Sequence, residues 1–242
     1  MVPCYNEEKR LDVTAFRDFV AQPSGASLLF VDDGSRDQTV QVVERVRSGF
    51  ESRVEILRCE RNGGKAEAVH RGMNQLLEQG WWTYIGFWDA DLATPLNAVA
   101  DFIGILESRP DIEMVFGSRV KLLGRDIQRR PTRHYLGRVF ATVVSNILRM
   151  PIYDTQCGAK LFRVGPDLVT ALRDPFLSKW VFDVEIIARY LRSYRARGQR
   201  LDDRVYEFPL LRWADIGGSK VKPTDFLLAF KDTLRIWRKY LS

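Results

Sequence analysis

The sequence has few of the residues that build disulfide frameworks and zinc sites. Its 242 residues include three cysteines and two histidines. Cys4, Cys59 and Cys157 are odd in number and far apart, so they indicate neither a disulfide framework nor a Cys-X-X-Cys metal motif. His70 and His134 are too few and too distant in sequence to predict a zinc site. This cysteine usage favours a reducing, cytosolic compartment.

Long apolar runs are also missing. No stretch approaches the roughly 20 apolar residues that span a bilayer, and no secretory signal peptide is recognisable. The hydrophobic content of 45% is nevertheless enough to fill a core, which excludes a disordered chain. Because no repeat or low-complexity linker divides the sequence, we expect a single domain over residues 1–242.

The net charge of +6 is unevenly distributed. Only Asp126 and Asp154 are acidic between residues 119 and 163, a stretch rich in lysine and arginine. The basic residues there are Arg119, Lys121, Arg125, Arg129, Arg130, Arg133, Arg138, Arg149, Lys160 and Arg163. This pattern predicts an anionic ligand, although a solvated basic face is the alternative. Nucleic acid is disfavoured because few aromatic residues are interleaved with the charges.

Short apolar runs alternate with helical patterns in the first half. We expect strands at 27–31, 54–57, 84–88 and 113–117, and helices at 38–47, 65–79 and 95–107. The second half predicts helices at 131–150 and 182–194 and an extended stretch at 205–212. This βαβα order predicts an α/β fold with a largely parallel sheet, which binds ligands at the carboxyl ends of its strands.

Two aspartates follow the apolar run 84–88. Asp89 and Asp91 are hard oxygen ligands that suit Mg²⁺ or Mn²⁺, whose coordination is usually completed by substrate phosphates. The alternative is that they cap the next helix, but Thr94 and Pro95 already supply an N-cap and a first-turn proline. The pair therefore points to a nucleotide diphosphate.

Two other segments end at the same predicted sheet edge, residues 3–8 and 32–37. Asp32 or Asp33 could accept hydrogen bonds from a base or ribose, and Tyr5 could stack on the base; an ordinary tight turn is the alternative for 33–35. Lys65 follows two glycines at a helix start, where it could face phosphate, or the segment could be a simple loop.

The last helical pattern, 224–241, is amphipathic. Phe226, Phe230, Trp237 and Leu241 lie near one face, with lysines and arginines interspersed. Such a helix could lie in a membrane interface or pack on the domain, and the sequence leaves both open.

These motifs together resemble the family 2 glycosyltransferases of GT-A fold, most closely the dolichyl-phosphate β-glucosyltransferases and then other polyprenyl-phosphate glycosyltransferases. The resemblance covers nearly the whole chain and is carried by segments 2–7, 32–35, 62–65, 89–91, 117–119, 154–162, 180–185 and 217–220. It implies a Rossmann-like, mostly parallel central sheet flanked by helices, with a helical C-terminal part. Residues 1–118 would bind the nucleotide sugar, 119–223 the acceptor, and 224–242 would form the amphipathic helix.

The resemblance also implies roles for individual residues. Donor binding would use Pro3, Tyr5, Glu7, Asp32, Asp33, Lys65 and Asp89. The metal would be held by Asp89 and Asp91, which with Arg119 form the expected catalytic set. The acceptor phosphate would meet Arg119, Arg130, Arg133, Arg212, Ser219 and Lys220.

The implied activity is inverting, Mg²⁺- or Mn²⁺-assisted transfer of a hexose, with UDP-glucose as the expected donor, to a polyprenyl or dolichyl phosphate. Ala93 stands where the mannosyl enzymes place a glutamine, which favours the glucosyl branch. We expect peripheral attachment to the cytoplasmic face of a membrane and no nucleic-acid partner. A carbohydrate hydroxyl acceptor is an alternative that needs a general base, for which Asp154, Asp183 and Glu185 are candidates. A non-catalytic binder of sugar nucleotides or nucleic acid is another.

Overall fold

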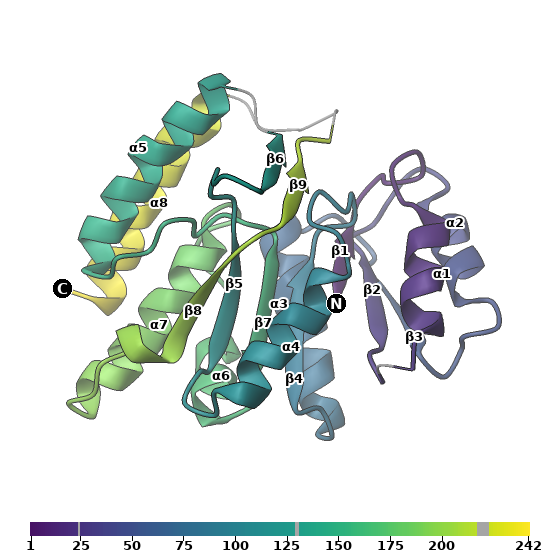
Figure 1. Ribbon diagram of the computed structural model, residues 1–242, viewed down its shortest axis with the longest axis horizontal. Helices are drawn as coiled ribbons and strands as arrows, with labels where there is room; N and C mark the ends of the chain where they lie inside the picture. Colours follow the sequence, from purple (N-terminus) through teal and green to yellow (C-terminus); the bar gives the residue numbers. More distant parts are fainter. Residues whose placement is uncertain (24, 129–130, 217–222) are drawn as a thin grey trace.

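The computed structural model describes residues 1–23, 25–128, 131–216 and 223–242, except for the side chains of 131–134 and 223–227. Strands run through the middle of the molecule and helices lie on both sides of them (Figure 1). The strands that come first in the chain lie at one end, and helices α5 and α8 lie at the other (Figure 1).

The first three strands form a parallel sheet in the order β1-β2-β3, with bounds Val2–Cys4, Leu28–Asp32 and Val54–Arg58. All residues of β2 are buried, because both faces are covered. Leu28 and Phe30 belong to the apolar cluster that includes α1 (Val13–Ala21) and α2 (Thr39–Arg47). Leu29 and Val31 belong to the cluster that includes α3 (Lys65–Gln79). This alternation is the two-residue period of a strand buried on both faces.

Four more strands form a second sheet in the order β4-β7-β5-β8, with bounds Tyr84–Trp88, Ala159–Arg163, Met114–Ser118 and Val205–Pro209. The Met1 ammonium donates to the Gly86 carbonyl at 2.6 Å, and the Trp88 N–H donates to the Met1 carbonyl at 3.0 Å. These bonds join β1 to β4. Strand β7 runs antiparallel to both of its neighbours, so the sheet is mixed at this point.

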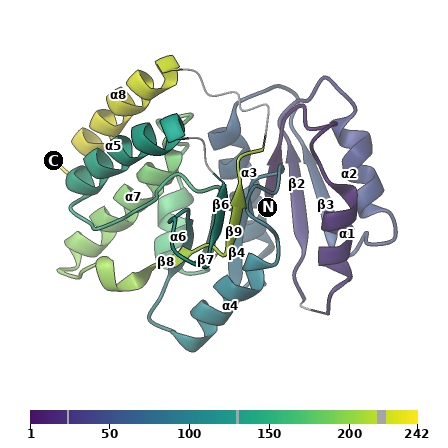
Figure 2. The same cartoon turned by 45° about the horizontal axis from the view of Figure 1, so that its top comes forward.

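A small parallel ribbon, β6 (Asp126–Gln128) with β9 (Arg212–Ala214), lies beyond this sheet. The remaining elements are α4 (Ala98–Ser108), α5 (Pro131–Leu148), α6 (Pro166–Leu172), α7 (Phe182–Ala196), a 3₁₀ turn (Asp202–Arg204) and α8 (Pro223–Tyr240). Helices α5 and α8 lie side by side in both views (Figures 1 and 2), and the rings of Phe140 and Phe230 meet at 5.5 Å.

The predicted helix over 95–107 starts later than expected, at Ala98, and Thr94 is not its N-cap. The Thr94 side chain is buried, with its hydroxyl 3.8 Å from Cys157 Sγ, and its carbonyl accepts the Trp88 indole N–H at 2.8 Å. Asn97 precedes the first turn without a side-chain capping bond. The segment between Asp91 and Ala98 is therefore a turn, and the indole of Trp88 at the end of β4 binds its backbone.

Several members of the basic stretch 119–163 make hydrogen bonds within the fold. Arg138 donates to the Tyr153 carbonyl at 2.6 Å, and Arg163 donates to the Ile112 carbonyl at 3.1 Å. Lys160 is 1% exposed. A uniformly solvated basic face is thus wrong for these residues, because they stabilise loops and strands of the second half.

None of the helices in the described ranges combines the length and the apolar character that a bilayer crossing requires.

Candidate active site at the strand ends

The loops that follow β1 and β2 are bound to each other. The Asp33 N–H donates to the Cys4 carbonyl at 2.8 Å, and the Asn6 N–H donates to Ser35 Oγ at 2.9 Å. The Arg36 N–H in turn donates to Asn6 Oδ1 at 2.8 Å. The expected convergence of segments 3–8 and 32–37 at one sheet edge is therefore present in the structure.

A cavity of about 400 Å³ opens beside the end of β2. Asp32 is 5% exposed, lines this cavity, and accepts the Ser35 N–H at 3.3 Å. Gly34 has φ +68°, and a Cβ there would lie 2.8 Å from the carbonyl carbon of Arg61. Glycine is therefore required for the two loops that form the cavity to approach each other.

Asp33 is occupied by backbone groups. Its two carboxylate oxygens accept the N–H groups of Gly63 and Gly64 at 2.8 and 2.7 Å. Burial raises the pKa of Asp33, and these two amide bonds oppose the rise without cancelling it. Asp33 thus holds the glycine loop that leads into α3 and positions Lys65; its contact with a nucleoside stays a prediction.

The residues expected at the start of the donor site lie on β1 and just after it. Pro3 belongs to β1 and Tyr5 follows it, both partly buried. Glu7 is 7% exposed, and its Oε2 accepts a hydrogen bond from Arg10 Nε at 2.7 Å. The pKa of Arg10 is raised by this bond with Glu7 and further by the charges of Asp91 and Asp89. Arg10 therefore contributes positive potential at the aspartates, a role that the sequence did not suggest.

Asp89 lies between a lysine and a glycine. Its Oδ1 is 2.5 Å from Lys65 Nζ, and its N–H donates to the Gly158 carbonyl at 3.0 Å. A Cβ on Gly158 would lie 1.9 Å from Asp89 Oδ2. The carboxylate therefore rests directly on the glycine that precedes β7, and a larger residue there would displace it.

Asp91 follows in a tight turn. Its Oδ1 accepts the Ala93 N–H at 3.2 Å, and Leu92 between them has a left-handed φ of 52°. Burial and the neighbouring Asp89 carboxylate raise the pKa of Asp91. Two carboxylates that repel each other, with a lysine ammonium already placed on one, form a site that fits a cation. The described residues hold no cluster of three or more metal-ligating side chains, so a divalent ion would also need substrate oxygens.

Arg119 is held firmly by a carboxylate. Its Nε and Nη2 donate to the two oxygens of Asp154 at 2.6 and 2.7 Å, and its guanidinium lies 5.3 Å from the Trp213 ring centroid. Burial would lower the pKa of Arg119, but Asp154 raises it above its ordinary value. Glu207 supports the pair by accepting the backbone N–H of Asp154 at 2.8 Å.

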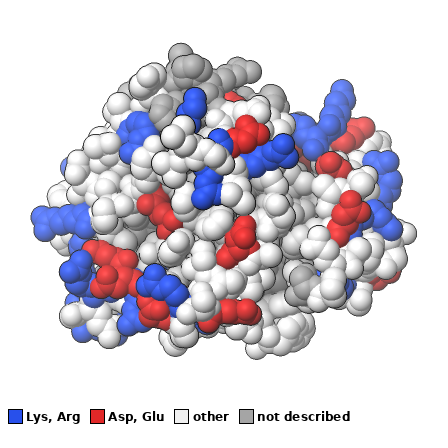
Figure 3. Space-filling view, in the orientation of Figure 1, with Lys and Arg blue, Asp and Glu red and all other residues white. Residues whose placement is uncertain are grey.

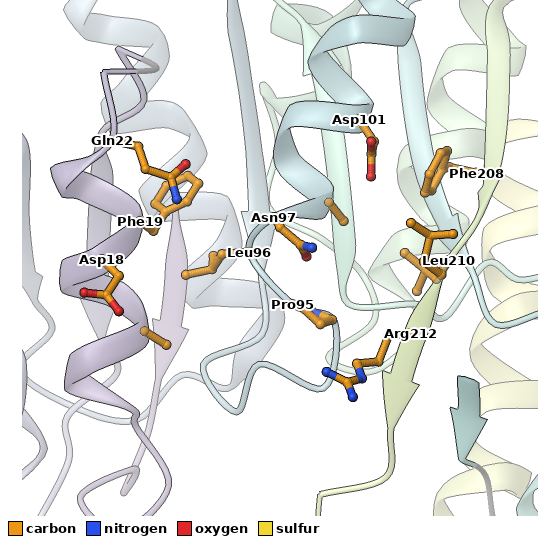
Figure 4. A pocket seen from close by; sticks show the side chains of 13 residues that line it. Asp18, Phe19, Gln22, Pro95, Leu96, Asn97, Asp101, Phe208, Leu210 and Arg212 are labelled. Atoms are coloured by element: carbon orange, nitrogen blue, oxygen red, sulfur yellow. The ribbon is translucent and has the colours of Figure 1, made fainter. Parts of the chain in front are cut away.

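Arg212, the other expected acceptor residue that the structure describes, does not lie with Arg119. Arg212 adjoins Trp213 on β9 and therefore points to the opposite face of that strand. It is exposed and lies 3.4 Å from Asp126. Arg212 lines a separate cavity of about 250 Å³, between α1, the turn before α4 and the end of β8 (Figure 4). The side chains of Arg130, Arg133, Ser219 and Lys220 lie outside the described residues.

The three candidate general bases are all neutralised by ion pairs. Asp154 is paired with Arg119, as described. Asp183 Oδ1 lies 2.5 Å from Lys160 Nζ, and Glu185 Oε1 lies 2.7 Å from Arg189 Nη2. All three carboxylates are buried. This arrangement disfavours proton abstraction by Asp154 and Glu185, because each charge is committed to an arginine. Burial raises the pKa of Asp183 in spite of Lys160, and the same burial keeps its carboxylate from an acceptor hydroxyl.

Sequence reasoning missed Gly158 as the neighbour of Asp89 and Lys160 as the buried partner of Asp183. A signal was present, since both lie in the segment 154–162 that interrupts an apolar pattern with glycine and lysine. The antiparallel placement of β7 beside β4 could not be read from that signal, and this placement brings Gly158 against Asp89.

The family model Glycosyl transferase family 2 matches residues 1–168. The chain belongs to glycosyltransferase family 2. Among curated proteins, this family 2 chain is similar to a dolichyl-phosphate β-glucosyltransferase of Dictyostelium discoideum, with 32% identity over 100% of the chain and 74% of that protein. The proteins of the same name from Saccharomyces cerevisiae and Homo sapiens are 30% and 29% identical over 100% of the chain, and 74% and 75% of their own lengths.

Solved structures of low identity share the fold. Glucosyl-3-phosphoglycerate synthase from Mycobacterium tuberculosis matches with a TM-score of 0.66 and 18% identity over 100% of the chain and 79% of that structure. A Pyrobaculum calidifontis mannosyltransferase in complex with GDP-Man and Mn²⁺ has a TM-score of 0.58 and 17% identity over 97% of the chain and 63% of that structure. The expected α/β fold of GT-A type is confirmed, and this family 2 member is a glycosyltransferase.

Proposed function

We propose that this enzyme transfers glucose from UDP-glucose to the phosphate of dolichol or another polyprenol, with inversion at the anomeric carbon. The names of its curated relatives support the sugar and the acceptor. The observation that carries the proposal is the placement of Asp32, Asp89 and Asp91 at converging strand ends, with a cavity beside Asp32 and the Lys65 ammonium on Asp89.

The donor would bind with its nucleoside in the cavity beside Asp32 and its diphosphate near the start of α3. The N-terminus of a helix and a lysine both favour phosphate, and α3 begins at Lys65. Asp89 and Asp91 would hold Mg²⁺ or Mn²⁺, which stabilises the negative charge that develops on a departing diphosphate. Arg10 adds positive potential from the β1 side.

The acceptor needs positioning more than deprotonation. A phosphate monoester has a second pKa of about 6, so it is largely ionised near neutrality. The pairing of Asp154, Asp183 and Glu185 agrees with a reaction that uses no protein base. Arg119 is fixed in one orientation by Asp154 and could present its remaining edge to the phosphate. In-line attack opposite the leaving diphosphate gives the β-linked product from an α-linked donor.

Peripheral attachment to the cytoplasmic face of a membrane would bring the enzyme to a lipid acceptor. Helices α5 and α8 carry exposed apolar side chains: Tyr135, Leu136, Val139, Leu228, Leu234 and Trp237. Lys231, Arg235, Arg238 and Lys239 accompany them on α8. The flank over α5 is mostly uncharged, with isolated basic side chains (Figure 3). Apolar and basic groups together favour an anionic lipid surface.

One edge of α8 packs on the domain, since Thr233 and Ile236 are fully buried. Trp237 is 39% exposed next to them, so the helix has both a packed and an exposed side. The two possibilities that the sequence left open for this helix are therefore compatible, and contact with lipid remains part of the proposal.

The test is transfer of radiolabelled sugar into lipid. The purified protein, incubated with UDP-[¹⁴C]glucose, Mn²⁺ and dolichyl phosphate in detergent, should yield a product that is extractable into organic solvent and labile to mild acid. GDP-mannose and UDP-galactose serve as donor controls. Label that enters a soluble oligosaccharide in place of the lipid would reject the phosphate acceptor in favour of a carbohydrate hydroxyl.

A further inference from the structure

A buried ion pair lies beneath the strand-end aspartates. Lys160 is the second residue of β7 and is 1% exposed, and Asp183 in the first turn of α7 is 5% exposed. Their charged atoms are 2.5 Å apart. Replacing such a pair by apolar residues is often neutral or stabilising, because both charges lose their hydration. Stability therefore gives little reason for a charged pair in the centre of the sheet.

The side chains that flank Lys160 are aromatic. Its register partners on the two neighbouring strands are Phe87 and Phe116, and its ammonium lies 5.3 and 5.4 Å from their ring centroids. An apolar side chain would suit this environment. The ammonium also donates to the Cys157 carbonyl at 2.5 Å, so Lys160 fixes the backbone just before β7.

The backbone at Cys157 and Gly158 supports the Asp89 side chain, which belongs to the neighbouring strand end. Gly158 immediately follows Cys157, its carbonyl accepts the Asp89 N–H, and its Cα lies directly under the Asp89 carboxylate. A shift of the Cys157 carbonyl would therefore move the surface on which Asp89 rests. This is the first route from the buried pair to the site.

The second route runs through Lys65. The Asp183 carboxylate interacts electrostatically with the Lys65 ammonium, as Asp89 does. Lys65 Nζ lies 6.0 Å from the ring centroid of Phe182, the residue before Asp183, and contacts Asp89 directly. Four charges thus alternate in sign from the sheet edge inward, in the order Asp89, Lys65, Asp183 and Lys160.

We propose that Lys160 and Asp183 are positioning residues for the donor site: they hold the Asp89 carboxylate from below through Gly158 and from the side through Lys65. The inference rests on the proposed function, since it concerns the same metal and diphosphate site. Neither residue contacts the donor. Their effect is to keep Asp89 and Lys65 in the geometry that a metal–nucleotide complex requires.

The experiment replaces both charges at once, by Lys160→Met with Asp183→Leu, because either single change would leave a buried charge without its partner. Binding of UDP with Mn²⁺ is measured by isothermal titration calorimetry, and the midpoint of thermal unfolding is measured without ligand. We expect the double variant to unfold within a few degrees of the unaltered protein while its Kd for UDP with Mn²⁺ rises about 10- to 100-fold, the usual effect of losing an outer-shell partner.

The control is the other buried pair of α7, Glu185→Leu with Arg189→Met, which is similarly buried. This variant also loses the hydrogen bonds of Glu185 to two backbone N–H groups and of Arg189 to three backbone carbonyls, so its unfolding midpoint should fall. Its Kd for UDP with Mn²⁺ should stay within about twofold of the unaltered protein. Gly158→Ala disturbs Asp89 from the same side as Lys160 and should weaken UDP binding as well, with the unfolding midpoint largely kept.

The outcomes separate the two proposals. If the unaltered protein does not bind UDP with Mn²⁺, the proposed donor site is wrong. If it binds and the Lys160/Asp183 double variant binds equally well, the positioning role is wrong. Equal weakening in both double variants, with a parallel fall of the unfolding midpoint, would mean a general loss of packing and would also overturn the inference.

Discussion

Carboxylates have different partners in the two halves of the molecule. At the ends of β2 and β4, Asp32, Asp33 and Asp91 accept backbone N–H groups, and Asp89 is the carboxylate that contacts a lysine. In the second half, the carboxylates Asp154 and Glu185 are held by arginines. Amides fix a carboxylate without neutralising its charge. The first half therefore keeps negative charge for a cation, whereas the second half is charged but internally neutralised.

Replacing Asp91 should abolish activity, which depends on the first half, without lowering the stability of the second half. Asp91→Ala should lower kcat/KM for sugar transfer about 1,000-fold or more. The divalent cation that Asp91 holds in our proposal would be lost, and with it the positive charge that stabilises the departing diphosphate. The thermal unfolding midpoint in the absence of metal should not fall, since the carboxylate is crowded by Asp89. Transfer rates and calorimetric scans check the two parts. Unchanged turnover would reject the assignment of Asp91.

Breaking an ion pair of the second half should lower the stability of the fold. Arg189→Met leaves Glu185, which is fully buried, without its cation, and should cost about 3–5 kcal/mol in the free energy of unfolding. Urea denaturation followed by tryptophan fluorescence measures this. Glu185 would still accept N–H groups of Leu177 and Ser178. A cost below about 1 kcal/mol would show that these amides suffice, and the contrast between the halves would fail.

Arg119 is the residue in which the two roles meet. Arg119→Ala should raise the KM for the acceptor about 10- to 100-fold and the KM for the donor much less, because its cation is directed at the acceptor phosphate in our proposal. It should also destabilise the fold, since Asp154 loses its partner. Arg119→Ala combined with Asp154→Asn restores neutrality and serves as the stability control. A matched loss for donor and acceptor would reassign Arg119 to the diphosphate.

The pH dependence of metal binding should sharpen the description of the first half. Because the pKa of Asp91 is raised by burial and by Asp89, affinity for Mn²⁺ with UDP should fall as pH drops through that raised value, by up to about tenfold per pH unit below it. Asp89→Asn removes one of the two causes and should move the transition to lower pH. Titration calorimetry in buffers of different pH measures it.

The sign for stability is opposite to that for binding. The folded, metal-free protein holds a proton on Asp91 at pH values where the unfolded chain has lost it, so this group makes stability fall as pH rises through the window between the two pKa values. Bound metal should remove that fall. If Asp91 instead made the stability of the metal-free protein rise with pH in this window, its pKa would not be raised in the folded state.

The sequence predicted β2 to β5, α2 to α4, α5 and α7 well, because their apolar runs and helical periodicity are uninterrupted. The expected strand 84–88 and helix 65–79 coincide with β4 and α3. Strand β7 was missed, since Lys160 and Arg163 break its apolar pattern, and only their tertiary partners make burial possible. Helix α1 and the short helix α6 were missed as well.

The candidate site was predictable in part for the same reason. Asp32, Asp89 and Asp91 could be placed because they directly follow predicted strands, and parallel strand ends share one edge. The pairing of Arg119 with Asp154 and the separation of Arg212 from them depend on how β9 and the loop before β7 fold back. Such long-range contacts leave no local pattern, so residue types alone could not distinguish an acceptor arginine from a structural one.

The left-handed backbone at Leu92 has a consequence for anyone who modifies this protein. A residue with a Cβ adopts that conformation at a cost of about 1 kcal/mol, and glycine adopts it without that penalty. Leu92 also packs against the apolar cluster that includes α1 and α4, so a change to glycine would lose more buried apolar surface than it gains in backbone freedom. Leu92→Gly should therefore lower the thermal unfolding midpoint, and because it loosens the turn between Asp91 and Ala93 it should also weaken the manganese binding that we propose.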